Sequence, residues 1–322
     1  MRVSVVVPTY RRPELLGRCL AALAAQEFDP AAYEIVIADD AADDATRRQV
    51  EAFAGGARPA VRYAPVRARH GPAAARNTGW LTARGTVIAF TDDDCVPDRG
   101  WLAAGLEACD ADPGAAAVSG RVVVPLSAAP TDYERDAAGL EGAEFVTANC
   151  FVRRAALAAV GGFDERFAAA WREDSDLQFT LLAAGGRIAH APKAVVVHPV
   201  RPAPWGVSLR QQRKAQYEAL LYRKHPDLYR RRIRPWRPWG YYATLAALGV
   251  AAGAACGGLT VPALAAGGAW ALLTGRFCAT RMRGTSRAPG HVAEMVVTSA
   301  LIPPLSVFWR LVGAVRFRVL FF

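Results

Sequence analysis

The stretch at residues 87–90 constrains the fold most, because an apolar β segment there runs directly into three carboxylates, Asp92, Asp93 and Asp94. The segment does not alternate between apolar and polar residues, which predicts a strand covered on both faces of its sheet. Three adjacent Asp side chains repel one another, so something has to offset their charge. Mg²⁺ or Mn²⁺, which prefer oxygen ligands, would do so. An acidic turn with Asp94 as a helix cap accounts for the triplet equally well.

Strand and helix patterns alternate along the first 95 residues, which predicts a parallel, doubly wound α/β sheet. Ligands bind beyond the carboxyl ends of the strands in such sheets, and Asp39 and Asp40 follow the second strand there. The next hundred residues indicate antiparallel strands and a helix at 171–184. Strands are expected at residues 3–7, 33–38, 61–63, 87–90, 117–124, 145–152 and 194–198.

Over about residues 1–225 the chain resembles the family 2 glycosyltransferases. The motifs that carry the resemblance are Val5-Val6-Val7-Pro8-Thr9-Tyr10, Asp39-Asp40, Gly71-Pro72-Ala73-Ala74-Ala75-Arg76-Asn77-Thr78-Gly79, Asp92-Asp93-Asp94, Asn149 with Arg153-Arg154, Gly161-Gly162-Phe163-Asp164, Glu173-Asp174-Ser175-Asp176-Leu177 and His198. The resemblance implies an inverting enzyme with a GT-A fold, whose mixed central sheet is followed here by C-terminal apolar helices. Arg11, Ala41-Ala42 and Thr180 differ from the usual Asn, Gly-Ser and Arg of the family.

The resemblance also implies roles for individual residues. Asp174, with Glu173 beside it, would accept the proton of the acceptor hydroxyl. Asp94 and His198 would hold Mg²⁺ or Mn²⁺, and Asn149 and Asp176 would lie on the acceptor side. The residues expected to bind the nucleotide sugar are Pro8, Thr9, Tyr10, Arg11, Glu14, Asp39, Arg76, Asn77, Asp92 and Asp93.

The positive charge of the chain is concentrated in one segment. The formal net charge is +10, and residues 201–237 hold 11 Lys or Arg against Glu218 and Asp227. The chain has no helix-turn-helix, RNP or finger pattern, so we expect no nucleic-acid partner and interpret this segment as a contact with a membrane surface. The six Cys form no C-x-x-C pair, and residues 3–7 are too short for a signal-peptide core, so the first domain is expected in a reducing cytoplasm.

The last third of the chain is apolar. Residues 241–275 carry no charge, and a single helix of that length would exceed a hydrocarbon core of about 30 Å. We therefore expect a helical hairpin broken near Gly257-Gly258 and Pro262. The alternatives are one tilted helix, a re-entrant or interfacial pair of short helices, and a soluble Ala-rich bundle. A second apolar run at 292–309 is expected to kink at Pro303-Pro304. Arg residues on both sides of the hairpin, including Arg281, indicate that both ends lie on the cytoplasmic side.

These observations predict a catalytic domain at residues 1–200, a basic linker at 201–240 and membrane-associated helices at 241–322. The expected activity is inverting transfer of a sugar from a nucleotide-diphosphate sugar, with a UDP-sugar favoured, to a lipid-linked or cell-envelope glycan hydroxyl. The expected location is the cytoplasmic side of the cell membrane. A non-catalytic nucleotide-sugar-binding or scaffolding relative is the alternative. A sugar nucleotidyltransferase would need a glycine-rich loop and Lys that the chain lacks.

Overall fold

The computed structural model describes residues 1–54 and 59–321, which form two compact units. The first unit contains Met1–Pro125 and Ala138–Val200. The second contains Leu126–Ala137 and Arg201–Phe322, of which Phe322 lies outside the described residues. The short segment Leu126–Ala137 therefore packs with the C-terminal third of the chain, whereas the predicted catalytic domain at residues 1–200 included it.

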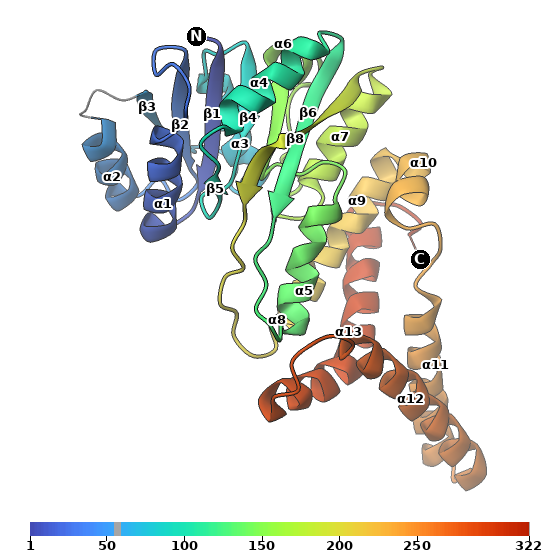
Figure 1. The fold of residues 1–322 in the computed structure, drawn as a ribbon. Coiled ribbons are helices and arrows are strands. Elements are labelled where there is room, and N and C mark those ends of the chain that lie inside the picture. The colour runs from blue at the N-terminus through green and yellow to red at the C-terminus, as the bar shows by residue number, and fades with distance from the viewer. Residues whose placement is uncertain (55–58, 322) are drawn as a thin grey trace. The chain divides into compact units, whose positions relative to one another are not determined.

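The first unit is built on one mixed, eight-stranded sheet with the order β3-β2-β1-β4-β7-β6-β8-β5 (Figure 1). Strands β3, β2, β1 and β4 are parallel, whereas β7 runs antiparallel to both β4 and β6. The expected mixed α/β sheet is thereby confirmed. The strands are β1 Val3–Thr9, β2 Tyr33–Asp39, β3 Ala60–Pro65, β4 Val87–Phe90, β5 Val96–Pro97, β6 Ala115–Val123, β7 Cys150–Arg153 and β8 Arg187–Val197.

Helices cover both faces of this sheet, which is why its central strands are mostly apolar. The buried exceptions Ser4 and Glu34 are hydrogen-bonded to each other over 2.6 Å. Along β1, Val5 and Val7 face the core that contains Leu16 and Trp101, whereas Val6 faces the core that contains Trp80. The helices of this unit are α1 Pro13–Ala24, α2 Asp44–Ala54, α3 Pro72–Thr82, α4 Trp101–Ala111, the 3₁₀ helix Gly139–Gly142, α6 Arg154–Val160 and α7 Glu173–Ala183.

The strand expected at residues 145–152 is shorter than predicted, because β7 begins only at Cys150. The preceding residues form a turn closed by the Asn149 N–H, which donates to the Val146 carbonyl over 3.1 Å. The Asn149 side chain holds this turn in place, since its amide donates to the carbonyls of Arg121 and Ala194. Buried apolar residues such as Phe145 therefore mimic a strand in the sequence but pack from a loop.

Gly105 lies where α4 packs tightly against the Phe151 side chain of the sheet. A Cβ there would lie 2.1 Å from Cζ of the buried Phe151 ring, whereas a Cβ at Gly100, at the start of the same helix, would meet open space. Ala is normally the better helix residue by about 1 kcal/mol. We nevertheless expect Gly105→Ala to destabilise the unit by about 1–3 kcal/mol through overpacking. Thermal unfolding monitored by circular dichroism should show a larger loss of Tm for Gly105→Ala than for Gly100→Ala, because the Cβ added at the N-cap residue Gly100 meets no atom within 4 Å.

The second unit is helical. Its helices are α5 Asp132–Ala138, α8 Val207–Gln211, a 3₁₀ helix Gln212–Ala215, α9 Gln216–Lys224, α10 Pro226–Leu228, the π-helix Tyr229–Ile233, α11 Trp239–Cys256, α12 Thr260–Arg281 and α13 Pro289–Arg316. Helices α11 and α12 pack together as the expected hairpin, which turns at Gly257-Gly258. Helix α13 contains both Pro303 and Pro304, and Figure 1 shows its two halves running in different directions.

Arg281 holds the segment Leu126–Ala137 in this unit. Its guanidinium pairs with Asp132 over 2.6 Å and donates to the hydroxyls of Thr298 and Ser299 over 2.7 and 3.1 Å. Only 8% of the Arg281 side chain is exposed. Arg281 therefore has a structural role in this unit, whereas the cytoplasmic orientation of the hairpin ends stays a prediction.

Candidate functional site

Two groups of carboxylates meet at one edge of the sheet. Strands β2, β1 and β4 are parallel neighbours, and their register sets Thr9 beside Asp39 and Phe90 beside Val6. Asp39 thus ends β2 at the same edge from which the chain leaves β4 toward the Asp triplet. The sequence pattern therefore locates the candidate site where parallel sheets usually bind their ligands.

The middle carboxylate of the triplet, Asp93, is held by the turn after β1. The Thr9 hydroxyl donates to Asp93 Oδ2 over 2.8 Å, and Arg12 Nη1 donates to Oδ1 over 3.1 Å. Burial raises the pKa of Asp93, and the nearby Arg12 acts in the opposite direction. Asp93 is only 3% exposed, and a donor from the turn after β1 engages each of its oxygens, so it joins the two loops. Its contact with the nucleotide sugar stays a prediction. Arg12, which the sequence analysis did not single out, is the arginine that reaches the triplet. Binding of the nucleotide sugar by Arg11 stays a prediction.

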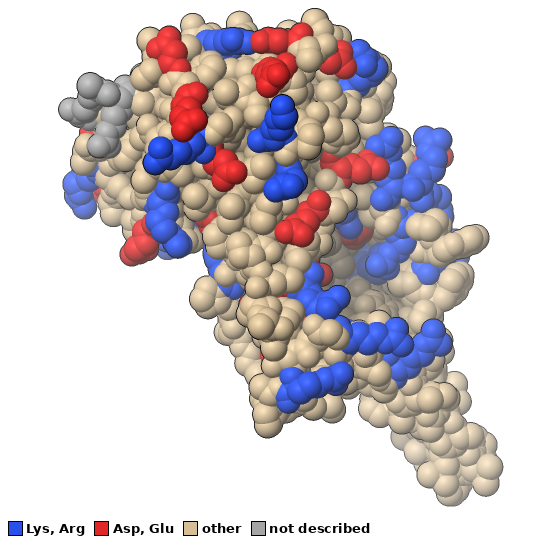
Figure 2. Space-filling view, viewed as in Figure 1, with Lys and Arg blue, Asp and Glu red and all other residues tan. Residues whose placement is uncertain are grey.

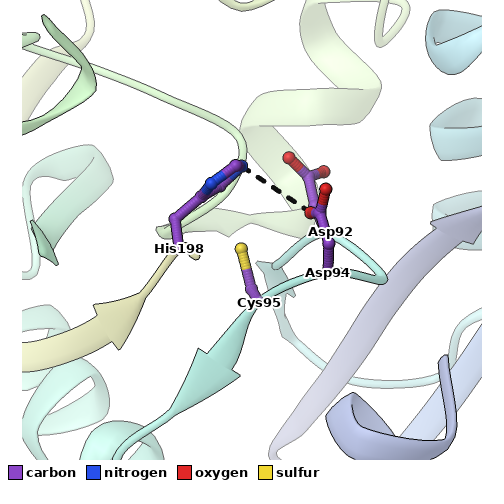
Figure 3. A group of neighbouring side chains, drawn as sticks. All are labelled: Asp92, Asp94, Cys95 and His198. Atoms are coloured by element: carbon purple, nitrogen blue, oxygen red, sulfur yellow. Dashed lines mark ion pairs between the residues drawn. The ribbon is translucent and has the colours of Figure 1, made fainter. Parts of the chain in front are cut away.

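The other two carboxylates of the triplet lie beside Cys95 and His198, and the four side chains converge in Figure 3. One potential ligand atom from each lies within 4.8 Å of the others, and His198 Nε2 is 3.6 Å from Asp94 Oδ1. The Nδ1 atom of His198 is buried without a hydrogen-bond partner. Two carboxylates and one imidazole are a donor set that suits Mn²⁺ or Mg²⁺.

Cys95 is the member of this cluster that sequence reasoning missed. Its side chain is fully buried, and burial raises its thiol pKa well above the usual range, with Asp92 and Asp94 adding to the effect. A protonated thiol is a poor ligand for a hard cation. Cys95 therefore lies beside the cluster without acting as a ligand. The potential ligand atoms are the carboxylate oxygens of Asp92 and Asp94 and the imidazole nitrogen of His198.

Arg76 connects this cluster to helix α7. From α3, its Nη2 donates to Asp92 Oδ1 over 2.7 Å and its Nη1 donates to Glu173 Oε1 over 3.1 Å. Burial acts to lower the Arg76 pKa, but Asp92 and Glu173 outweigh it and hold the pKa above its usual value. Arg76 is 3% exposed, so it is a buried cation shared by two acidic groups that lie far apart in the sequence.

Three carboxylates lie in the first turn of α7, and they differ in accessibility. Glu173 and Asp176 are buried at 4% and 2% exposure, whereas Asp174 between them is partly exposed. Burial raises the pKa of Glu173 to about 7, with Arg76 acting in the opposite direction. Burial also raises the pKa of Asp174, against the N–H of Ser175 and the charge of Arg172. Asp174 is therefore the carboxylate of this turn that an approaching hydroxyl can reach.

Asp39 is enclosed by donors from the protein. Its carboxylate accepts from the N–H groups of Ala41 and Asp43 and from the Tyr63 hydroxyl at 2.9–3.0 Å. Burial, together with this bond to Asp39, raises the Tyr63 pKa. Asp40 next to it accepts from the N–H of Gly71 over 2.9 Å and so ties β2 to the start of α3. Nucleotide binding by Asp39 stays a prediction.

Two of the predicted site residues, Asn77 and Asn149, make hydrogen bonds that hold neighbouring segments in place. The Asn77 amide donates to the Phe163 carbonyl and accepts from the Phe163 N–H, which locks the Gly161-Gly162 turn onto α3. Asn149 is fully buried, and its oxygen accepts from Trp101 Nε1 over 2.8 Å. The acceptor-side role of Asn149 and the nucleotide-sugar contact of Asn77 stay predictions.

The remaining predicted residues lie on the turn after β1. Tyr10 is 49% exposed, Arg11 and Glu14 are exposed, and Pro8 is partly buried. Arg11 has a positive φ of 53° and places its guanidinium over the Tyr10 ring at 5.4 Å. This turn thus presents an aromatic face and a cation beside the carboxylate edge, a combination that suits a nucleotide.

The sequence matches glycosyl transferase family 2 over residues 4–156 and glycosyl transferase family group 2 over residues 87–311. It is 28% identical over 221 residues to glycosyltransferase AglE of Haloferax volcanii, covering 65% of this chain and 70% of that protein. It is 31% identical over 215 residues to the succinoglycan biosynthesis protein ExoM of Rhizobium meliloti, covering 62% and 67%. Identity to a pre-mycofactocin glycosyltransferase of Mycobacterium tuberculosis is 36% over 178 residues, and the match covers 49% of this chain and only 36% of that longer protein.

Among solved structures, the chain is similar to the mannosyltransferase PcManGT from Pyrobaculum calidifontis in complex with GDP-Man and Mn²⁺. The TM-score is 0.62 at 24% identity, with 96% of this chain and 87% of that chain covered. Residues 1–349 of S. aureus TarS give a TM-score of 0.53 at 15% identity, with 94% and 90% covered. At these identities the similarity bears on the fold alone.

Proposed function

Because the chain belongs to glycosyltransferase family 2 and has its GT-A fold, we propose that it moves a sugar from a nucleotide-diphosphate sugar to an acceptor hydroxyl with inversion. The observation that carries the proposal is the Arg76 bridge. This one buried guanidinium joins Asp92, in the carboxylate cluster after β4, to Glu173, beside the accessible Asp174. Arg76 thereby fixes the carboxylate cluster, which would serve the leaving diphosphate, relative to Asp174, which would serve the acceptor.

The donor side of the site consists of Asp94, Asp92 and His198, which we assign to a divalent cation. When bound there, Mn²⁺ or Mg²⁺ supplies the positive charge that the leaving diphosphate requires. The protein contributes the orientation of these ligands: Arg76 fixes Asp92, and Thr9 and Arg12 fix the neighbouring Asp93. The exposed Tyr10 and Arg11 lie beside them, where the base or ribose would bind.

The acceptor side centres on Asp174, which we assign as the general base. It is the accessible carboxylate of the α7 turn, and its raised pKa makes it a stronger base than an ordinary Asp. Glu173, which pairs with Arg76, positions the turn. Attack by the activated hydroxyl on the sugar face opposite the diphosphate would give inversion in one displacement.

An assay with a set of nucleotide-sugar donors tests the proposed function directly. Purified full-length protein would be incubated with Mn²⁺, a membrane lipid extract as acceptor, and UDP-, GDP- and dTDP-linked sugars in turn. We expect release of free nucleoside diphosphate with one donor, with a UDP-sugar as the first candidate. The PcManGT complex with GDP-Man makes GDP-mannose the necessary comparison. Absence of release with every donor would favour the non-catalytic alternative.

For the acceptor we propose a lipid-linked or envelope glycan at the cytoplasmic face of a membrane. Among the described residues, α13 is the one helix long and apolar enough to cross a membrane, but 44% of its apolar window is buried within the chain. The end of the α11–α12 hairpin is different, because Val261 and Leu264 are 78% and 72% exposed and no charge occurs near them. We therefore assign membrane attachment to the hairpin.

Replacing Val261 and Leu264 by Asp tests this attachment. We expect the wild type to remain in the membrane pellet after a carbonate wash and the double variant to appear in the supernatant. Each carboxylate in the hydrocarbon would cost about 2.5–3.5 kcal/mol. Leu81→Asp is the matched control, since Leu81 is 63% exposed but lies in α3 of the first unit. Release of the wild type by the wash would show peripheral attachment instead.

A further inference from the structure

A pocket in the second unit combines four arginines with aromatic rings, and none of the described residues that line it is acidic. Arg230 and Arg234 lie at or just after the π-helix Tyr229–Ile233, Arg237 precedes α11, and Arg310 comes from α13. The rest of the lining consists of Tyr222, Tyr229, Trp236, Leu320 and Phe321. Four like charges around one hollow repel one another, so an anion would stabilise them.

Arg310 forms the floor of this pocket. It is only 5% exposed, its guanidinium stacks on the Phe321 ring at 4.1 Å, and its buried Nε has no hydrogen-bond partner among residues 1–54 and 59–321. A buried donor without a partner is costly, so such an atom indicates a ligand. Glu218, the buried acid nearby, accepts from the Tyr229 hydroxyl over 2.6 Å and does not line the pocket.

Aromatic rings form a packed wall of the pocket. The rings of Tyr222, Tyr229 and Phe321 pack on one another with centroids 5.3–5.6 Å apart. Arg230 donates to the Tyr222 hydroxyl over 2.9 Å, and its guanidinium lies 5.0 Å from the Tyr222 ring centroid. Planar guanidinium groups held on aromatic faces keep their outer N–H groups free for phosphate oxygens. π-helical turns of this kind occur frequently at functional sites.

We propose that this pocket binds a phosphoryl group, with the phosphate of an anionic membrane lipid as its main source. The apolar hairpin begins directly after it, at Trp239, and Trp236 at the pocket rim is 77% exposed. Exposed Trp residues next to arginines are typical of the level at which lipid head groups lie. On the face shown in Figure 2, Lys and Arg gather around α10 and the C-terminal end, whereas the free end of the hairpin shows no charge.

Binding is measured on the full chain in neutral detergent, without nucleotide sugar, so that the result is independent of glycosyl transfer. The probes are inorganic pyrophosphate and micelles containing either phosphatidic acid or phosphatidylcholine. We expect phosphatidic acid to bind and phosphatidylcholine not to bind. Binding of phosphatidic acid alone supports a lipid source, and competition by pyrophosphate supports a phosphoryl site that also accepts the free anion.

Substitutions of single arginines distinguish binding in this pocket from nonspecific attraction to the positive charge of the segment. Arg310→Met and Arg234→Gln should each weaken phosphatidic acid binding about tenfold, the loss of one charge-assisted contact. Arg231→Gln is the matched control, because Arg231 is exposed on the same π-helix but does not line the pocket. If Arg310→Met fails to fold, the exposed Arg234→Gln and Arg237→Gln variants decide the question. Equal losses in Arg231→Gln and Arg234→Gln, or no binding of either phosphate probe, would overturn the proposal.

Discussion

Asp94→Ala is expected to abolish the Mn²⁺-dependent binding of a nucleoside diphosphate. Asp94 is the carboxylate that faces His198 at 3.6 Å, and it is buried at 8% exposure, so no neighbouring side chain can replace it. Asp93 is engaged by Thr9 and Arg12, and Asp92 is paired with Arg76. Isothermal titration calorimetry with UDP and with GDP, each with and without Mn²⁺, measures the loss directly.

The control for this variant is Asp98→Ala. Asp98 follows in the same loop, and its side chain is exposed, whereas its backbone N–H and carbonyl make the bonds that hold the loop. Asp98→Ala therefore removes a similar charge from the same region without touching the cluster. Unchanged Mn²⁺-dependent affinity in Asp94→Ala, with both variants folded, would rule out Asp94 as a metal ligand.

The sequence predicted the strands of the parallel half of the sheet well because their signal is local. Val3–Thr9, Tyr33–Asp39 and Val87–Phe90 are buried on both faces, and such strands read as uninterrupted apolar runs. The same signal failed at residues 145–149, where apolar residues pack from a loop. The apolar pattern there indicates only that the residues are buried. Whether they form a strand depends on pairing partners that are distant in the chain.

The candidate site likewise depends on contacts between residues that are distant in the chain, which the sequence pattern does not show. The Asp triplet and the α7 carboxylates could be recognised from their types and spacing, but their connection through Arg76 spans 97 positions and depends on the fold. The pairing of Arg12 with Asp93 also depends on the backbone, since the positive φ at Arg11 turns the chain just before Arg12. The burial of Arg281 against Asp132 likewise joins residues that are 149 positions apart.

Asp174→Asn is expected to keep donor binding and to lower turnover by at least ~100-fold, the usual contribution of a general base. The substitution preserves the shape of the side chain, and the Asn oxygen can still accept from the Ser175 N–H, which Asp174 now accepts at 2.6 Å. The structure of the α7 turn should therefore persist, and the loss should fall on kcat. Steady-state kinetics together with calorimetry of donor binding separate these two effects.

The pH profile identifies which carboxylate acts. A general base works only when deprotonated, so wild-type kcat/KM should fall as the pH drops through the pKa of Asp174, which burial raises above that of an ordinary Asp. Asp174→Asn should lack this acidic limb, because Asn does not titrate. Glu173→Gln and Asp176→Asn serve as comparisons from the same turn, and both should retain the limb. If Asp174→Asn transfers sugar at a near-normal rate and one of these two variants does not, the base is that neighbour, and Asp174 only lines the acceptor site.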